Sequence, residues 1–222
     1  MNVIVISSHP DDEMIGCGGT LLKHKANNDK IGWVIITNVD ESQGFSSERV
    51  NSRQIEIEEV AKEVGFDSVF KLNFPTTSLS SSTVGKLIQA ISKVFNEFKP
   101  EIIYTVNRSD AHSDHRYTFD AVGSCIKSFR YPFIKKVLMY ECLSETEFAP
   151  ALNEKVFLPN HFVDISTYYD EKERILKIYE SEIGEHPFPR SLRNLKALAT
   201  YRGATAGVEY AEAFQLILSI DK

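Results

Sequence analysis

Short runs of consecutive apolar residues alternate along the chain with longer stretches in which apolar residues recur every three or four positions. Two of the runs, residues 2–7 and 31–37, are continuous and rich in β-branched side chains, which is typical of parallel strands covered on both faces. Residues 101–106 (EIIYTV) are also typical of a strand. The pattern therefore predicts buried strands that alternate with amphipathic helices.

The helical stretches carry start and stop signals. Residues 80–83 offer N-caps to a helix whose apolar positions keep the 3.6-residue period, and Lys99-Pro100 marks its end. Another helix over residues 46–64 ends at Gly65. Similar patterns predict helices over residues 115–130, 166–179 and 192–201, a helix that begins at Leu21 and stops at Asn27, strands over residues 69–72, 137–142 and 161–164, and a last short helix over residues 211–220.

The order of these elements, strand, loop, helix, strand, is that of a doubly wound sheet. We expect a single-domain, Rossmann-like α/β fold in which a mostly parallel sheet has helices on both faces. The 222 residues suffice for one large domain with a substantial core. Because no linker or repeat interrupts the pattern, residues 1–222 are expected to form that one domain.

Composition narrows the classes of partner. The chain has 25 Lys and Arg against 31 Asp and Glu, and its net charge is −6, which argues against nucleic acid as a partner. The three cysteines have no CxxC spacing, so a disulfide framework is not expected. No apolar run is long enough to span a bilayer and no basic leader precedes the first strand. We expect a cytoplasmic protein with a small-molecule substrate. The sequence allows either a monomer or a homo-oligomer.

Two clusters of histidine and aspartate directly follow predicted strands. His9–Glu13 (HPDDE) comes after the first strand, and His112–His115 (HSDH) comes after the strand over residues 101–106. Open α/β sheets bind ligands beyond the carboxyl ends of their strands. The two clusters are therefore expected to share one crevice.

These clusters have the chemistry of a divalent metal site. A catalytic zinc usually takes three ligands from His, Asp, Glu or Cys and keeps an open position for water. His9 and Asp12 can supply two of these ligands and His115 the third, while Asp11 reaches the water. Each cluster alone has a simpler explanation, since Asp-Asp pairs also stabilise helix N-termini. Cys17, close by, is either a thiolate ligand or a small buried residue.

At these residues the chain resembles the LmbE-like (PIG-L) family of zinc-dependent N-deacetylases. The two clusters carry the resemblance, which covers nearly the whole chain. Gly16 and Gly18-Gly19 match together with the first cluster. Weaker matches are Arg53 and Glu56 with Ala61 and Gly65, residues 162–166, and residues 210–214. The segment after the second strand, residues 37–42, lacks the glycine-acid turn often seen in this family, which bears on the substrate rather than on the metal chemistry.

The resemblance implies a role for each residue of the two clusters. Zinc, or another divalent metal such as Fe²⁺, would be bound by His9, Asp12 and His115. Asp11 would be the general base that takes a proton from the metal-bound water. His112 would stabilise the oxyanion or protonate the departing amine, and Asp114 would orient a histidine of its own loop.

The expected activity is removal of the N-acetyl group from an N-acetylglucosamine-type amino sugar or conjugate. Arg53 either contacts this substrate or forms a helix-surface salt bridge with Glu56. Two alternatives remain open. One is a metal-dependent hydrolase of another amide. The other is a non-catalytic sugar- or nucleotide-binding module, which the glycines after the first strand favour and the acids of that loop oppose.

Overall fold

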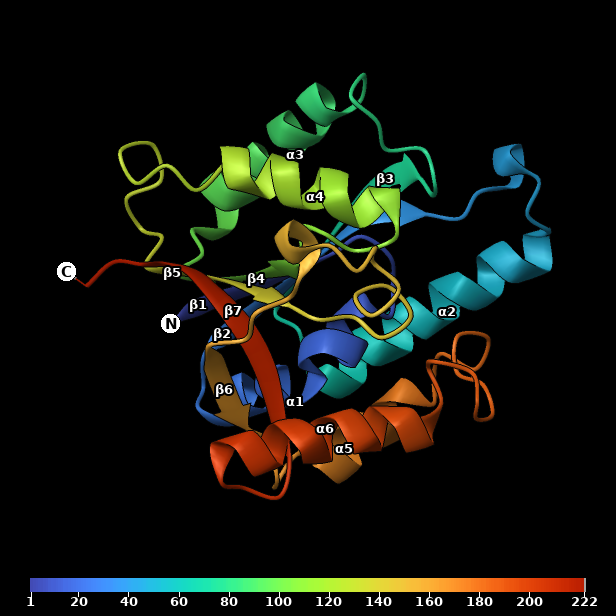
Figure 1. Ribbon diagram of the computed structural model, residues 1–222. Helices are drawn as coiled ribbons and strands as arrows, with labels where there is room; N and C mark the ends of the chain where they lie inside the picture. Colours follow the sequence, from blue (N-terminus) through green and yellow to red (C-terminus); the bar gives the residue numbers. More distant parts are fainter. Residues whose placement is uncertain (222) are drawn as a thin grey trace.

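The computed structural model describes residues 1–221, and they form a twisted sheet of seven strands between two layers of helices (Figure 1). The strand order is β3-β2-β1-β4-β5-β7-β6. The strands are β1 (Asn2–Ser7), β2 (Lys30–Asn38), β3 (Ser68–Pro75), β4 (Ile102–Val106), β5 (Lys136–Tyr140), β6 (His161–Asp164) and β7 (Ala211–Ser219). The predicted fold class, an α/β Rossmann-like fold with a mostly parallel sheet, is confirmed.

The order of the strands reverses at β1. The chain runs from β1 to β2 and β3 on one side, then returns to place β4 and β5 on the other, so β1 pairs in parallel with both β2 and β4. Such a reversal is the topological switch point at which doubly wound sheets bind ligands. The two clusters follow β1 and β4, and they therefore emerge side by side.

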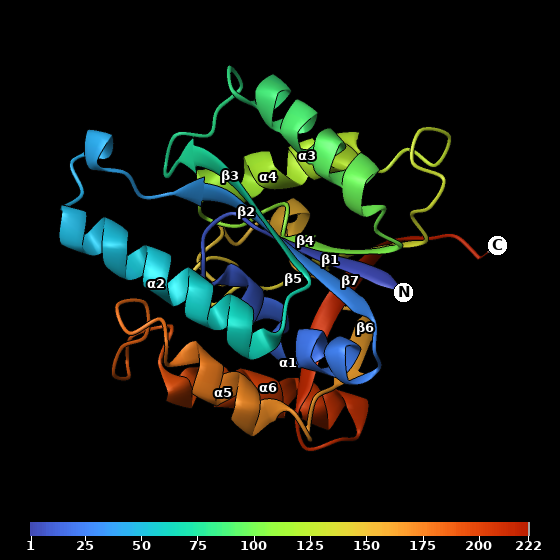
Figure 2. The ribbon, with the colours of Figure 1, turned by 180° about the vertical axis from the view of Figure 1, so that it is seen from behind.

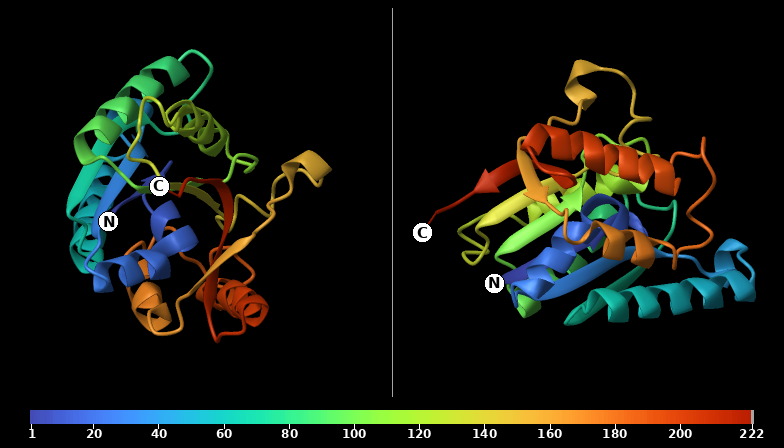
Figure 3. Two further views of the ribbon diagram at one scale, coloured as in Figure 1. Left: turned by 90° about the vertical axis from the view of Figure 1, so that its left-hand side faces the viewer. Right: turned by 90° about the horizontal axis from the view of Figure 1, so that it is seen from below.

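The helices divide between the two faces of the sheet. In Figures 1 and 2, α3 and α4 cover one face, and α1, α2, α5 and α6 cover the other. Figure 3, which views the molecule from two further sides, shows the sheet between these layers. The helices are α1 (Asp12–Ala26), α2 (Ser47–Val64), α3 (Val84–Phe98), α4 (Ser113–Ser124), α5 (Tyr169–Leu176) and α6 (Leu192–Ala206), with short 3₁₀ turns at Glu41–Gln43 and Asn153–Lys155.

Two hydrophobic cores result, one on each face. In β1, Val3 and Val5 point into the core under α1 and α2, and Ile4 and Ile6 point into the core under α3. Since successive side chains of a strand point to opposite faces, a strand buried on both faces needs an unbroken apolar run. This requirement explains the continuous apolar run of residues 3–6.

The last predicted element is wrong. Residues 211–220 were expected to form a short helix, but they form β7, which pairs antiparallel with β5 and β6. Short apolar runs do not distinguish a buried strand from a helix by period alone. Burial between two strands decides the conformation here.

Four helices also differ in their bounds from the prediction, and one of them, α6, continues to Ala206 rather than ending at Tyr201. α1 begins at Asp12 rather than Leu21, because the glycines expected in a loop lie inside the helix. They allow close packing, because a Cβ on Gly16 would collide with the Tyr140 ring. α4 ends at Ser124 rather than near residue 130, and α5 spans only Tyr169–Leu176. In residues 1–221, no helix has the length and apolar character needed to cross a membrane.

Candidate metal centre

A cavity of about 290 Å³ opens where the loops after β1 and β4 meet. Every residue of the two clusters that was predicted to bind metal or act in catalysis lines it, except Asp114, which lies just behind the wall. The cluster residues in its wall are His9, Asp11, Asp12, His112 and His115. The switch point of the sheet thus brings together side chains that are far apart in sequence.

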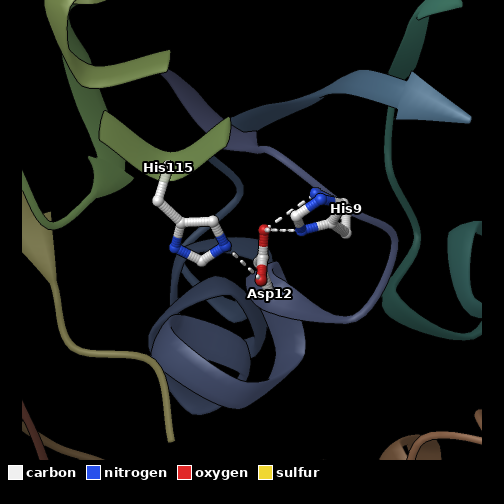
Figure 4. A group of neighbouring side chains, drawn as sticks. All are labelled: His9, Asp12 and His115. Carbon is white, nitrogen blue, oxygen red and sulfur yellow. Dashed lines mark hydrogen bonds and ion pairs between the residues drawn. The ribbon is translucent and has the colours of Figure 1, made fainter. Parts of the chain in front are cut away.

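His9, Asp12 and His115 form a compact group of possible ligands (Figure 4). The chosen ligand atoms all lie within 4.8 Å of one another. The carboxylate of Asp12 lies between the two rings, with its oxygens 3.3 Å from Nε2 of His115 and 3.8 Å from Nδ1 of His9. Two imidazole nitrogens and a carboxylate oxygen are a common ligand set for a catalytic zinc.

His9 and His115 each contact a further carboxylate through the ring nitrogen that does not face Asp12. Nδ1 of His115 lies 2.8 Å from Asp110, and Nε2 of His9 lies 3.2 Å from Asp114. A carboxylate on one ring nitrogen fixes the tautomer and leaves the other nitrogen free for a metal. Nε2 of His115 is indeed buried without a hydrogen-bond partner among residues 1–221. A divalent cation fits this arrangement.

The local electrostatics favour a positive charge on His115 and a negative charge on Asp12. Burial alone lowers the pKa of His115, but Asp12 and Asp110 outweigh it and raise that pKa well above the usual value. Burial likewise opposes ionisation of Asp12, yet the neighbouring His115 and His9 lower the pKa of Asp12 far below its usual value. Asp12 is therefore ionised and able to act as a ligand throughout the neutral range.

The position of Asp114 differs in part from the expectation. It was predicted to orient a histidine of its own loop, but its nearer histidine is His9 of the other loop, at 3.2 Å, against 4.0 Å for His112. Backbone N–H groups of Thr77 and Leu79 also donate to its carboxylate. Asp114 thereby ties the two loops to the segment after β3.

Asp110 is a site residue that the sequence reasoning missed. It lies outside the HSDH cluster, five positions before His115, and its carboxylate also accepts hydrogen bonds from Asn107 and Thr146. Its position in the same loop after a buried strand was a usable signal, because a buried metal-binding histidine commonly has such a carboxylate partner.

Asp11 lies in the cavity wall beside the ligand group and is not one of the three side chains that would hold a metal. Its side chain is buried, and burial followed by the charge of Asp12 raises the pKa of Asp11 well above the usual value. Its φ of 132° is rare for any residue other than glycine. Thr77 and Ser144, also in the cavity wall, have positive φ as well. Such backbone strain is frequent at functional sites.

His112 caps the N-terminus of α4. Its Nδ1 accepts the backbone N–H of Asp114, so the proton of the neutral ring is on Nε2. Burial, with a smaller contribution from His9, lowers the pKa of His112 from 6.5 to about 4. The side chain is therefore a neutral N–H donor at pH 7.

The sequence profile of the PIG-L family, described as GlcNAc-PI de-N-acetylase, matches residues 4–126, more than half of the chain and the part that contains both clusters. The chain belongs to the PIG-L family. The expected resemblance to LmbE-like proteins is thus confirmed.

Among curated PIG-L relatives, diacetylchitobiose deacetylase of Thermococcus kodakarensis is 24% identical and the alignment covers 98% of this chain and 84% of that protein. The solved structure of the conserved protein TT1542 from Thermus thermophilus has a TM-score of 0.78 at 23% identity, over 100% of this chain and 97% of that one. GalB, a 4-carboxy-2-hydroxymuconate hydratase from Pseudomonas putida, has a TM-score of 0.72 at 17% identity, over 100% and 98%. The fold alone therefore does not determine the reaction.

Arg53 of this PIG-L protein forms the predicted ion pair with Glu56, while its contact with a substrate stays a prediction. It lines the cavity, and its Nε lies 3.3 Å from Glu56 one helical turn away. Its Nη1 also donates to the carbonyl of Pro10 at 2.8 Å. Arg53 thus connects α2 to the HPDDE loop.

The two cysteines near the site have different environments. Cys17 is fully buried, its Sγ contacts the carbonyl of Glu13, and it does not line the cavity, which agrees with the packing role. Cys142, which the sequence reasoning did not select, lines the cavity with its Sγ 3.4 Å from Asp12. Burial raises the pKa of the Cys142 thiol well above its usual value, so it is a neutral neighbour of the ligand group.

Proposed function

We propose that this protein is a metal-dependent amidohydrolase that removes the N-acetyl group from an N-acetylglucosamine-type amino sugar or conjugate. One observation carries the proposal. Two histidines, each backed by a buried carboxylate, and one ionised aspartate converge beside a second aspartate of raised pKa, in a cavity at the switch point of the sheet.

His9, Asp12 and His115 would hold the metal. Zinc is the first candidate because zinc accepts mixed nitrogen and oxygen ligands, and another divalent metal such as Fe²⁺ suits the same set. When bound, such an ion polarises an acyl carbonyl and lowers the pKa of water. Asp110 and Asp114 would keep the two imidazoles in the tautomers that this binding requires.

Asp11 would act as general base. A carboxylate whose pKa is raised by burial and by the charge of Asp12 accepts a proton more readily than an ordinary aspartate. Asp11 would take a proton from the attacking water and pass it to the amine nitrogen as the C–N bond breaks. The products are acetate and the free amino sugar.

His112 would stabilise the oxyanion. The sequence left two roles open for this residue, oxyanion stabilisation and protonation of the amine. Its low pKa and the Nε2–H tautomer favour the first, because the neutral ring is a hydrogen-bond donor and has no extra proton to transfer.

The substrate assignment rests on the family and its relatives. A cavity of 290 Å³ is near the lower end of the range for small-molecule sites, and the Thermococcus relative is a diacetylchitobiose deacetylase. We infer that Arg53 contacts the sugar from the wall formed by α2. We also place the protein in the cytoplasm, in agreement with its three free, buried cysteines.

The test is release of free amine from a panel of N-acetylglucosamine conjugates, with and without a chelator. The proposal predicts amine release that the chelator abolishes and that added zinc or Fe²⁺ restores. Including N-formyl, N-propionyl and ureido analogues separates the acetyl-sugar activity from hydrolysis of another amide. Tight binding of these sugars without any release would instead support the non-catalytic module.

A further inference from the structure

Three arginines of the cavity wall converge on one carboxylate. Nη2 of Arg49 lies 2.6 Å from Oε1 of Glu182, and Nη2 of Arg190 lies 3.0 Å from Oε2. Arg53 also contacts Oε1. All four side chains line the same cavity as the ligand group. Arg53 also faces Glu56, so three guanidinium groups against two carboxylates leave an excess of positive charge, in a chain whose net charge is −6.

The excess belongs to Arg49 and Arg190. Arg53 is 5% exposed and already faces Glu56 and the carbonyl of Pro10, so its charge is compensated. Arg49 is 29% exposed and Arg190 is 20% exposed, and Glu182 is the acid that each contacts. Both side chains are thus partly exposed, and both line the cavity.

Arg190 is held in place by two segments that follow different elements. Its Nη1 donates to Oγ of Ser144, after β5, and its Nε donates to the backbone carbonyl of Glu182, after α5. The guanidinium of Arg49 donates to Oγ of Ser181 and to Oε1 of Glu182. The guanidinium groups are thus preorganised before any ligand arrives, which lowers the entropy lost on binding.

Arg49 and Arg190 lie in the wall of the same cavity as Asp11. A substrate that places its acetamido group beside Asp11 can therefore place the rest of the molecule against these two arginines.

Building on the proposed deacetylation, we propose that Arg49 and Arg190 form a subsite for an anionic group, a carboxylate or phosphate, on the aglycone of the amino-sugar substrate. Guanidinium groups bind both anions through paired, charge-assisted hydrogen bonds. Neutral sugar hydroxyls do not require a surplus of partly desolvated positive charge, whereas an anion compensates that surplus.

The test compares matched substrates. The carboxymethyl glycoside of N-acetylglucosamine is assayed against its methyl ester, and the phosphoethyl glycoside against the hydroxyethyl glycoside. The wild-type protein should have a kcat/KM for at least one anionic member about tenfold or more above that of its neutral partner. High salt should reduce this ratio because it screens exposed charges. The pair with the larger ratio identifies the anion.

The variants Arg49→Gln and Arg190→Gln should each bring the ratio toward one, chiefly through KM for the anionic member. The matched control is Arg202→Gln, since Arg202 pairs with Glu141 at 2.7 Å outside this cavity, and it should keep the wild-type ratio. If a glutamine variant does not fold, Arg→Lys at the same position retains the charge without the paired hydrogen bonds and should give an intermediate ratio.

Binding of the free-amine products, measured by calorimetry, makes the test independent of turnover. The subsite predicts tighter binding of the carboxymethyl or phosphoethyl product than of its neutral partner. Equal affinity for both members of each pair, or an anionic preference that survives in both arginine variants, would overturn the subsite. Amine release from the neutral glycosides would in that case still support the proposed deacetylation.

Discussion

Adjacent aspartates of the HPDDE cluster have opposite pKa shifts. Burial and the neighbouring charge of Asp12 raise the pKa of Asp11, while His115 and His9 lower that of Asp12. Pairs of titratable groups whose environments separate their pKa values commonly divide the roles of a reaction between them. We assign proton transfer to Asp11 and metal binding to Asp12 on this basis.

The variant Asp11→Asn tests this division. Amide and carboxylate have nearly the same shape, so the variant should fold and keep one bound metal per chain. Its kcat should fall by about 10²-fold or more, because general base catalysis contributes roughly that much. Steady-state kinetics with metal analysis of the same sample gives the answer. Near-wild-type turnover would remove Asp11 from the base role.

Asp110→Asn tests the carboxylate behind His115. Because loss of such a partner weakens metal binding by about 10- to 100-fold, the dissociation constant for zinc, measured by competition with a chelator, should rise by that factor. Asp120→Asn, at an exposed position of the same α4 region, serves as the control and should bind as the wild type does. Unchanged affinity in Asp110→Asn would contradict the role of Asp110.

The pKa of His112 leads to a prediction for the pH dependence of stability. Its pKa in the folded protein, about 4, lies below the ordinary 6.5, so the fold favours the neutral ring. The resulting contribution to stability is present above pH 6.5 and is lost as the pH falls toward 4. Histidine NMR of the folded protein should show one imidazole that titrates near pH 4 and that is missing from His112→Gln. Titration of this ring near its ordinary pKa would contradict a neutral hydrogen-bond donor.

At the scale of elements, α1 begins within the HPDDE cluster and positions it, although the backbone of this helix is interrupted. Cys17 has φ −147° within it, and side chains from two other elements supply the hydrogen bonds at the break. Nζ of Lys172, from α5, donates to the carbonyl of Ile15, and Glu212, from β7, accepts the backbone N–H groups of Gly19 and Thr20. Lys172 and Glu212 also pair with each other at 2.7 Å.

Glu212→Ala should destabilise the protein by about 3 kcal/mol, since removal of one partner leaves a buried charge without compensation. Urea unfolding measures the loss. Glu209→Ala, at an exposed position two residues before β7, should change the stability by less than about 0.5 kcal/mol. If the two variants were equally stable, the break in α1 would not depend on this ion pair.

The elements that the sequence predicts best are those with the most regular burial. Residues 2–7 are buried on both faces and α3 has a continuous apolar stripe, so β1 and α3 were predicted within a residue or two. β7 was predicted as a helix because its conformation depends on pairing with β5 and β6, which are distant in sequence. The glycines of α1 were predicted to lie in a loop. They are needed in the helix because Tyr140 and Ile165, which are distant in sequence, pack against them.

At the scale of the whole molecule, the site exists because β1 and β4 are neighbours. The sequence indicates that both clusters follow strands, and the general rule for doubly wound sheets then predicts their meeting. It does not indicate the arginine cluster, because Glu182 and Arg190 lie in an irregular segment after α5 whose path has no periodic signal. Cys142 was missed for a related reason, since only the folded loops bring it to Asp12.

The central claim is that His9, Asp12 and His115 hold one divalent metal on which N-deacetylation depends. The most direct measurement titrates chelator-stripped protein with zinc or Fe²⁺ and follows bound metal and amine release from an N-acetylglucosamine conjugate in the same samples. The account predicts that activity rises in proportion to bound metal and saturates at one ion per chain, and that His115→Ala neither binds the ion tightly nor gains activity. Full activity in the stripped protein would contradict it.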